Sequence, residues 1–369
     1  MRAAVLAVVC KLLVLVVVGL LLWRWTAPGR RHAALTLTPP SGDRRAYERV
    51  LKSALHLQSE LKQQKHTEKK KNVIRTGEPV HGDSNIYFVE ASCLANKPGR
   101  QALTQRQACS VESAAKMNPS SEVYLVHSCP IKYDKSKTIK HLVAYRNVRF
   151  WNFDMKHLVS GTPLEKWDYE SAFRNPSWSQ DHSSDVIRFL LLWKYGGTCL
   201  DLDIVVIKSM EILEPNFVCE DWNDLLSSNV LRVDYQRVGQ LISNLLILNI
   251  ATDLRENVVL SRNGSELVTS TFKDTCGVDR VSLMTPDACL GVVIHSRKLF
   301  FPVPPWRWDR FFNTSETNSV MWGVKDSFGV KMWGRQSHAG KVKTATRQAY
   351  GLLAEKFCPR IYSHSGPTF

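Results

Sequence analysis

The sequence predicts an α/β domain with a mostly parallel central sheet, preceded by a membrane anchor and a basic stem. Two observations carry this prediction: an apolar segment at the N-terminus, and an alternation of strand-like and helix-like segments that starts near residue 86. With 44% hydrophobic and 22% charged residues, the 369-residue chain has an ordinary globular composition. Collagen-like, low-complexity and wholly disordered chains are therefore excluded.

The first element is an apolar segment from Ala3 to Trp23, interrupted only by Lys11 and Gly19. A helix of these 21 residues, at about 1.5 Å per residue, just crosses a hydrocarbon core of about 30 Å. No small-x-small cleavage site follows it, which favours an uncleaved signal anchor over residues 1–23 rather than a cleaved signal peptide. More arginines follow the segment than precede it, which argues against a lumenal body; the cysteines and sequons described below outweigh this bias.

Residues 24–81 form the second predicted segment, a polar and basic stem. Apolar residues recur every three or four positions between Tyr47 and Leu61, which predicts a short amphipathic helix. A solvated spacer helix is favoured over a dimerising coiled coil because the heptads are too few. A homodimer through the stem stays open as the alternative.

The formal net charge of +15 at first suggests a nucleic-acid-binding surface. Residues 1–75, however, carry 15 Lys and Arg against 4 acidic residues, so only about +4 is left for the rest of the chain. The surplus charge therefore belongs to the anchor and stem, and nucleic-acid binding is excluded as the function of the body.

Cysteines and glycosylation sequons indicate the compartment. Eight cysteines lie outside the apolar segment and none forms a C-x-x-C pair: Cys93, Cys109, Cys129, Cys199, Cys219, Cys276, Cys289 and Cys358. Disulfides in an oxidising compartment are favoured over a zinc site, buried free thiols are the alternative, and the connectivity stays open. Sequons at Asn263 and Asn313 point the same way. We therefore expect a lumenal body over residues 82–369.

The body opens with a strand–helix–strand pattern. Ile86–Glu90, Glu122–His127 and Val148–Phe153 are rich in branched and aromatic residues, which predicts three short strands. A helical stretch, Thr104–Met117, lies between the first two. This order predicts a βαβ unit and hence a parallel sheet.

A second helix is predicted over Ser183–Lys194, ended by two glycines, with an apolar strand over Ile204–Ile207. Asp201 and Asp203 stand just before that strand, and in extended backbone positions i and i+2 face the same side. Two carboxylates aimed together need a cation between them, and a hard divalent ion, Mn²⁺ or Mg²⁺, bound with a nucleotide diphosphate satisfies that need. A solvated turn is the alternative.

The helix before this motif adds Asp185 and Arg188, which the i, i+3 spacing places on one face. A local ion pair would explain these two residues alone. The whole string from Ser184 to Asp203, however, resembles the core signature of glycosyltransferases with a DXD motif, and more closely the α1,4-glycosyltransferases of the lactosylceramide 4-α-galactosyltransferase family. Further matches are Cys109–Ala115, Thr162–Leu164 with Trp167, Phe301–Pro304 with Trp306, and Cys358-Pro359.

The resemblance implies a GT-A-like fold, with a nucleotide-sugar part over about residues 82–210 and an α1,4-glycosyltransferase C-terminal part over about 211–369. It also implies a single-pass type II Golgi enzyme that transfers galactose or an N-acetylhexosamine from a UDP-sugar to a glycolipid, with retention. On this chain Asp201 and Asp203 would bind the metal, and together with Asp185 and Arg188 they would bind the donor. The resemblance names no catalytic nucleophile.

The chain also departs from this family. Cys199 and Val186 stand where Tyr and Ala are usual, and the Gly-Pro-x-x-Leu-Thr-Arg stretch is represented only by Gly264–Ser270. The late His-x-Trp-Asn element, whose histidine is expected near the metal, starts here with Lys331. A lysine brings a positive charge and no lone pair at neutral pH. It could replace part of the metal's electrostatic role or weaken the site.

Three functions are compatible with these observations, and the first is preferred. The first is transfer of galactose or N-acetylgalactosamine to a lactosylceramide-type glycosphingolipid. The second is transfer of α1,4-linked N-acetylglucosamine to glycoprotein O-glycans, because acceptor pockets lie in variable loops. The third is a catalytically weakened homologue that only binds nucleotide-sugar or partner enzymes.

Overall fold

The computed structural model describes residues 74–94, 103–131, 136–175, 178, 180–255 and 264–369. They belong to one compact unit, Asn72–Phe369. The predicted anchor, the stem helix with its possible dimer, and the sequon at Asn263 lie outside the described residues. Within those residues, no helix combines the length and apolarity needed to span a bilayer.

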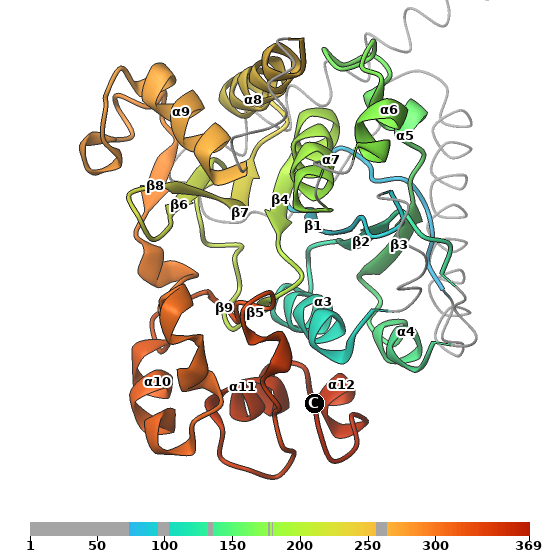
Figure 1. Ribbon diagram of the computed structural model, residues 1–369, viewed down its shortest axis with the longest axis vertical. Coiled ribbons are helices and arrows are strands. Elements are labelled where there is room, and N and C mark those ends of the chain that lie inside the picture. Colours follow the sequence, from blue (N-terminus) through green and yellow to red (C-terminus); the bar gives the residue numbers. More distant parts are fainter. Residues whose placement is uncertain (1–73, 95–102, 132–135, 176–177, 179, 256–263) are drawn as a thin grey trace, which may run out of the picture. The chain divides into compact units, whose positions relative to one another are not determined.

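Seven strands form the central sheet in the order β3-β2-β1-β4-β7-β6-β8 (Figure 1). Four of the six pairings are parallel and two, β4 with β7 and β6 with β7, are antiparallel. The prediction of a mostly parallel sheet is therefore confirmed. The strands are β1 (Ile86–Glu90), β2 (Val123–His127), β3 (Val148–Asn152), β4 (Gly197–Leu200), β6 (Phe217–Glu220), β7 (Leu226–Val233) and β8 (Val293–His295).

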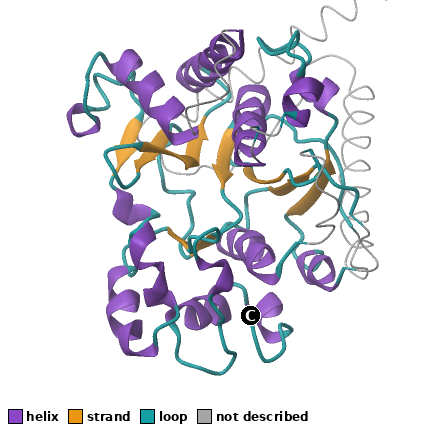
Figure 2. Ribbon diagram, viewed as in Figure 1, coloured by secondary structure: helices purple, strands orange, loops and turns teal. Residues whose placement is uncertain are grey.

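Helices cover both faces of this sheet (Figure 2). The α-helices are α3 (Gln105–Met117), α4 (Lys137–Leu142), α5 (Met155–Val159), α6 (Tyr169–Arg174), α7 (Gln180–Tyr195), α8 (Arg237–Arg255), α9 (Gly264–Cys276), α10 (Thr317–Gly323), α11 (Ala349–Phe357) and α12 (Pro359–Ser363). Short 3₁₀ helices are η2 (Val281–Leu283), η3 (Arg297–Leu299), η4 (Pro305–Phe311), η5 (Thr314–Glu316) and η6 (Ser337–Ala339).

The alternation along β1 divides the core into two layers. Ile86 and Phe88 join the apolar cluster that contains α3 and the C-terminal helices, whereas Tyr87 and Val89 join the cluster under α7 and α8. All four side chains are at most 8% exposed. Because successive strand residues face opposite ways, one buried strand serves both layers.

Local sequence signals explain most element boundaries. Thr104 caps α3 in a capping box with Gln107, which fixes the helix start where the sequence predicts it. Helix α7 begins at Gln180, three residues before the predicted Ser183, and ends before Gly196 and Gly197. At Gly197 the backbone has φ +102°, and a Cβ there would lie 2.6 Å from the Asn85 carbonyl oxygen. Glycine is therefore required where α7 passes into β4.

The predicted strand at Ile204–Ile207 is present, but it does not belong to the central sheet. It forms β5 (Ile204–Val206), which pairs antiparallel with β9 (Gly329–Lys331) in a separate two-stranded sheet. The main sheet instead receives β4, which the sequence analysis did not assign as a strand. The reason is that both segments are short and apolar, and periodicity alone does not say which one joins the sheet.

The cysteines divide into two groups. Three disulfides join Cys93 to Cys129, Cys109 to Cys358 and Cys276 to Cys289. Cys199 and Cys219 are buried free thiols on β4 and β6. The prediction of disulfides is confirmed for six cysteines, and the alternative of buried thiols holds for the other two.

The folded body includes residues that the sequence analysis placed in the stem. Thr76 forms a β-bridge to Phe150, and the backbone N–H of Phe150 donates to the Arg75 carbonyl at 2.9 Å. The chain therefore joins the edge of β3 before it enters β1.

Candidate active site

The site lies where the strand order of the sheet reverses. From β1 the chain proceeds outward to β2 and β3 and then returns to the other side of β1 as β4. The crevice at the carboxyl ends of strands around such a reversal is where open α/β sheets bind ligands. Asp201 directly follows Leu200, the last residue of β4, and Leu200 pairs with Phe88 of β1.

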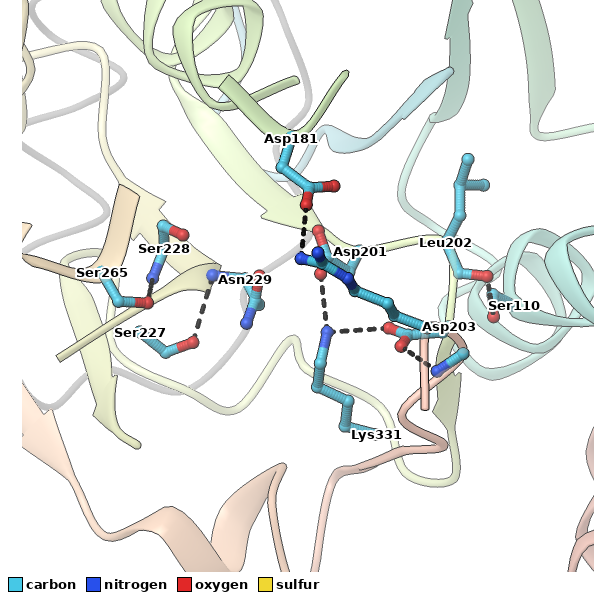
Figure 3. Close-up of polar contacts among 12 residues, drawn as sticks. Ser110, Asp181, Asp201, Leu202, Asp203, Ser227, Ser228, Asn229, Ser265 and Lys331 are labelled. Carbon is cyan, nitrogen blue, oxygen red and sulfur yellow. Dashed lines mark hydrogen bonds and ion pairs between the residues drawn. The ribbon is translucent and has the colours of Figure 1, made fainter. Parts of the chain in front are cut away.

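The Asp-x-Asp motif is a turn. The Ile204 N–H donates to the Asp201 carbonyl at 3.1 Å, and residues 202–203 are in turn conformation. The expectation that extended backbone aligns the two carboxylates is therefore wrong. They nevertheless converge on one cation because the turn brings Asp203 back beside Asp201 (Figure 3).

Arg188 is buried between two carboxylates, with a side chain 5% exposed. Its Nη1 donates to Asp185 Oδ1 at 2.5 Å and to the Ser228 carbonyl at 2.9 Å. Its Nη2 donates to Asp201 Oδ1. The planar fork thus joins Asp185 to Asp201, and the spacing on α7 predicts only its contact with Asp185.

Lys331, at the end of β9, is the second buried cation, with a side chain 7% exposed. Its Nζ donates to Asp201 Oδ2 at 2.6 Å and to Asp203 Oδ1 at 2.9 Å (Figure 3). The antiparallel pairing of β5 with β9 puts Lys331 opposite Ile204, immediately after the motif. The strand register therefore delivers the ammonium to the carboxylates.

A tight turn after β9 completes the cluster. Trp333 has φ +54°, a left-handed conformation that is costly for a side chain of this size. The turn directs the Gly334 N–H onto Asp203 Oδ2 at 2.7 Å, while Trp333 Nε1 donates to the Val303 carbonyl at 2.8 Å. Such strain is concentrated at functional sites in folded proteins.

The charges of the cluster control its pKa values. Burial alone would raise the pKa of Asp201, but the cations of Lys331 and Arg188 hold it below its ordinary value. Burial would lower the pKa of Lys331, but Asp201 and Asp203 raise it, so the amine stays protonated. Burial raises the pKa of Asp185 to about 6, against the opposing effect of Arg188 and with a further increase from Asp201.

The arrangement does not fit the divalent metal that the sequence analysis expects. All four carboxylate oxygens of Asp201 and Asp203 already accept hydrogen bonds, from Arg188, Lys331 and the Gly334 N–H. Among the described residues, no group of three or more His, Cys, Asp or Glu side chains is arranged to hold a metal ion. The Lys331 ammonium occupies the position between the two carboxylates, so no step of the chemistry is assigned to a metal.

All four residues predicted for the donor site meet in the fold. Arg188 links Asp185 to Asp201, and Lys331 links Asp201 to Asp203. Asn313, the described sequon, is exposed at the start of η5, where its Oδ1 accepts from the Ser315 N–H.

Sequence reasoning expected Lys331 near the metal, in place of the family's histidine, but assigned it no contact with the aspartates. It missed Asp221, whose pKa is raised by burial and which lies within electrostatic reach of Lys331 and Asp201. It also missed the exposed ion pair of Arg335 with Asp181 at 3.2 Å, which joins the turn after β9 to the start of α7. Only the departure at Lys331 gave a signal in the sequence.

Comparisons with known proteins agree with this site. Residues 104–237 match the glycosyltransferase sugar-binding region containing a DXD motif, and residues 241–365 match the alpha 1,4-glycosyltransferase conserved region. Lactosylceramide 4-alpha-galactosyltransferase of Rattus norvegicus is 27% identical over 287 residues, 77% of this chain and 76% of that protein. Alpha-1,4-N-acetylglucosaminyltransferase of Homo sapiens is 27% identical over 266 residues, 69% of this chain and 74% of that protein.

Among solved structures, the galactosyltransferase LgtC in complex with donor and acceptor sugar analogs is 12% identical, with a TM-score of 0.41 over 76% of this chain and 95% of that one. The two matched sequence regions cover most of the folded body, and all four predicted donor-site residues lie within residues 104–237. The chain therefore contains a DXD-type sugar-binding region followed by an alpha 1,4-glycosyltransferase conserved region, and it is a hexosyltransferase homologous to lactosylceramide 4-α-galactosyltransferase and α-1,4-N-acetylglucosaminyltransferase.

Proposed function

We propose that this chain transfers galactose or N-acetylgalactosamine from a UDP-sugar to the terminal sugar of a lactosylceramide-type glycosphingolipid, in an α1,4 linkage and with retention at the anomeric carbon. The observation that carries the proposal is the cluster of Arg188 and Lys331 with three aspartates at the carboxyl ends of β1 and β4. The relatives named lactosylceramide 4-alpha-galactosyltransferase support the choice of acceptor.

The cluster suits the departure of a nucleoside diphosphate. When the bond between the sugar and UDP breaks, negative charge develops on the diphosphate, and prearranged cations stabilise it as it forms. Arg188 and Lys331 are such cations, held in place by carboxylates before any ligand arrives. Asp185 accepts from Arg188 and is 15% exposed, so its carboxylate can also accept from a sugar hydroxyl.

The acceptor side of the site is aromatic. Trp306 is 61% exposed, and its ring packs edge-on against Trp222 with centroids 5.2 Å apart. Trp222 follows Asp221, the half-buried carboxylate that lies within electrostatic reach of Lys331. An exposed indole ring can stack on the apolar face of a terminal galactose, which is the role proposed for Trp306.

The site would lie in the Golgi lumen, at the membrane that holds the acceptor lipid. The three disulfides support an oxidising compartment. A single-pass type II anchor over residues 1–23 and a stem over 24–81 remain predictions from the sequence. Glycosylation at Asn263 and Asn313 is part of the same proposal.

A second candidate is transfer of N-acetylglucosamine to glycoprotein O-glycans, because a relative named for that donor has the same 27% identity to this chain as the human galactosyltransferase, over 69% rather than 77% of its length. A third is a homologue that binds nucleotide-sugar without turnover. The observation that favours the third is the ammonium of Lys331 at the position predicted for Mn²⁺ or Mg²⁺.

The test is a donor and acceptor screen with the full chain in detergent. UDP-galactose, UDP-N-acetylgalactosamine and UDP-N-acetylglucosamine are offered with lactosylceramide or an O-glycan acceptor, each with Mn²⁺ and with EDTA. We expect one galactose-configured donor to be transferred to the glycolipid, with an α1,4 linkage by NMR. Transfer of N-acetylglucosamine to the O-glycan would establish the second candidate, and UDP binding without any product would establish the third.

A further inference from the structure

We propose that Lys331 is the built-in cation of the donor site, so that this chain binds the diphosphate of its nucleotide-sugar without a divalent metal. The inference rests on the proposed function, because it concerns the same donor site. It is carried by the position of Lys331 Nζ, within 2.6 Å of Asp201 Oδ2 and 2.9 Å of Asp203 Oδ1.

The first step is steric. A divalent ion that bridges two carboxylate oxygens binds each of them at about 2.1 Å. Between Asp201 Oδ2 and Asp203 Oδ1 that position is taken by Lys331 Nζ. The other two oxygens accept from Arg188 and from the Gly334 N–H, so a metal bound there would have to share its ligands with these donors.

The second step is the anchoring of Lys331. Its backbone N–H donates to the Phe300 carbonyl at 2.9 Å, and β9 pairs with β5 on its other side. Its Nζ lies 5.6 Å from the centre of the Trp333 ring. A metal could enter only if this buried ammonium left both carboxylates, and an unpaired charge in a buried position is strongly unfavourable.

The third step is the remaining hydrogen-bonding capacity. An ammonium has three N–H donors, and the two aspartates use two of them. The third is left for a phosphate oxygen, which would form a charge-assisted hydrogen bond. Arg335, two residues beyond Trp333 and 86% exposed, supplies a second positive charge beside the turn. Lys331 and Arg335 together carry the charge of one divalent ion.

The experiment measures UDP binding by isothermal titration calorimetry with the full chain in detergent, in EDTA and with added Mn²⁺. We expect the dissociation constants of the unchanged protein to agree within about twofold in the two conditions. Lys331→Ala should weaken binding in EDTA by about tenfold or more, which is the loss of one charge-assisted hydrogen bond. The exposed Lys325→Ala is the matched control, and it should bind UDP as the unchanged protein does.

Lys331→His supplies the opposite test. Histidine provides a lone pair in place of the ammonium, so this variant should bind UDP in Mn²⁺ and lose it in EDTA. Electron paramagnetic resonance of Mn²⁺ should show protein-bound ion in Lys331→His and none in the unchanged protein without UDP.

Each result separates the two proposals. If the unchanged protein binds UDP only with Mn²⁺, the inference about Lys331 is wrong and the proposed function stands. If it binds UDP in neither condition, the proposed function itself fails. The unchanged protein alone gives these answers, so misfolding of a Lys331 variant does not remove the test.

Discussion

The buried carboxylate of Glu112 and the half-buried carboxylates of Asp201 and Asp203 have different hydrogen-bond partners. Glu112 on α3 is fully buried and accepts from the backbone N–H groups of Arg360 and Ile361 at 2.9 and 2.8 Å, and from the Tyr145 hydroxyl at 2.6 Å. Asp201 and Asp203 accept mainly from the side-chain cations Arg188 and Lys331. Glu112 fastens helix α12, whereas the two aspartates lie in the proposed donor site.

The difference separates structural from functional residues. Backbone N–H groups at a helix start cannot leave without unfolding the helix, so the Glu112 bonds are fixed. Side-chain cations can exchange one carboxylate oxygen for a phosphate oxygen without any change in backbone. Both carboxylate groups lie in segments that resemble the family, and only the partners reveal which group can bind a ligand.

The largest expected effect is on the structural side. Glu112→Ala leaves two backbone N–H groups and a tyrosine hydroxyl without their acceptor, and should lower the free energy of unfolding by about 4 kcal/mol. Thermal unfolding measures the change. Glu122→Ala, which removes a partly exposed partner of Arg149, is the control and should cost far less. Equal losses in the two variants would contradict the structural role of Glu112.

Asp203→Asn should act on function instead. The amide keeps the shape of the side chain but no longer neutralises Lys331, so we expect transfer to fall by about 100-fold, or about 2.7 kcal/mol in the activation free energy. The melting temperature should change less than in Glu112→Ala. Steady-state kinetics with the exposed Asp287→Asn as control measure the loss. Unfolding of Asp203→Asn at the temperature of the assay would instead place Asp203 with Glu112.

Arg188→Lys tests the fork of the guanidinium. Arg188 donates to Asp185, the Ser228 carbonyl and Asp201 at once. The shorter side chain of lysine ends in one ammonium group, which cannot keep all three contacts. We expect a loss of about 30-fold in kcat/KM for the donor, about 2 kcal/mol. Arg149→Lys, at a partly exposed ion pair, is the matched control. Near-normal kinetics in Arg188→Lys would remove this residue from the site.

The smallest effect is expected at Arg335. Its ion pair with Asp181 is exposed on both sides, so Arg335→Ala should leave the melting temperature unchanged. If Arg335 supplies charge to the diphosphate, UDP affinity should fall by about threefold, and the fall should shrink at high salt because exposed charges are screened. Calorimetry at two salt concentrations measures both. An unchanged affinity would leave Lys331 as the sole added cation.

Much of the fold could be predicted because its signals are local. The strand at Ile86–Glu90 and the helix start at Thr104 follow from branched residues and a capping box. The role of β4 could not be predicted, because four residues that begin with glycine and threonine give no strand signal of their own. The turn at Asp201 was also missed, since an Asp-x-Asp spacing is compatible with extended or turned backbone.

The residues of the candidate site also include some that local sequence predicts and one that it does not. The pairing of Asp185 with Arg188 follows from their spacing on one helix, and Asp201 and Asp203 stand two residues apart. The sequence by itself therefore indicated four residues of the proposed donor site. Lys331 lies 128 residues beyond Asp203, and only the register of β9 against β5 decides that its ammonium enters between the carboxylates. Contacts between distant segments depend on how whole elements pack and pair, which no local pattern encodes. The tertiary structure alone therefore decided which cation the aspartates hold.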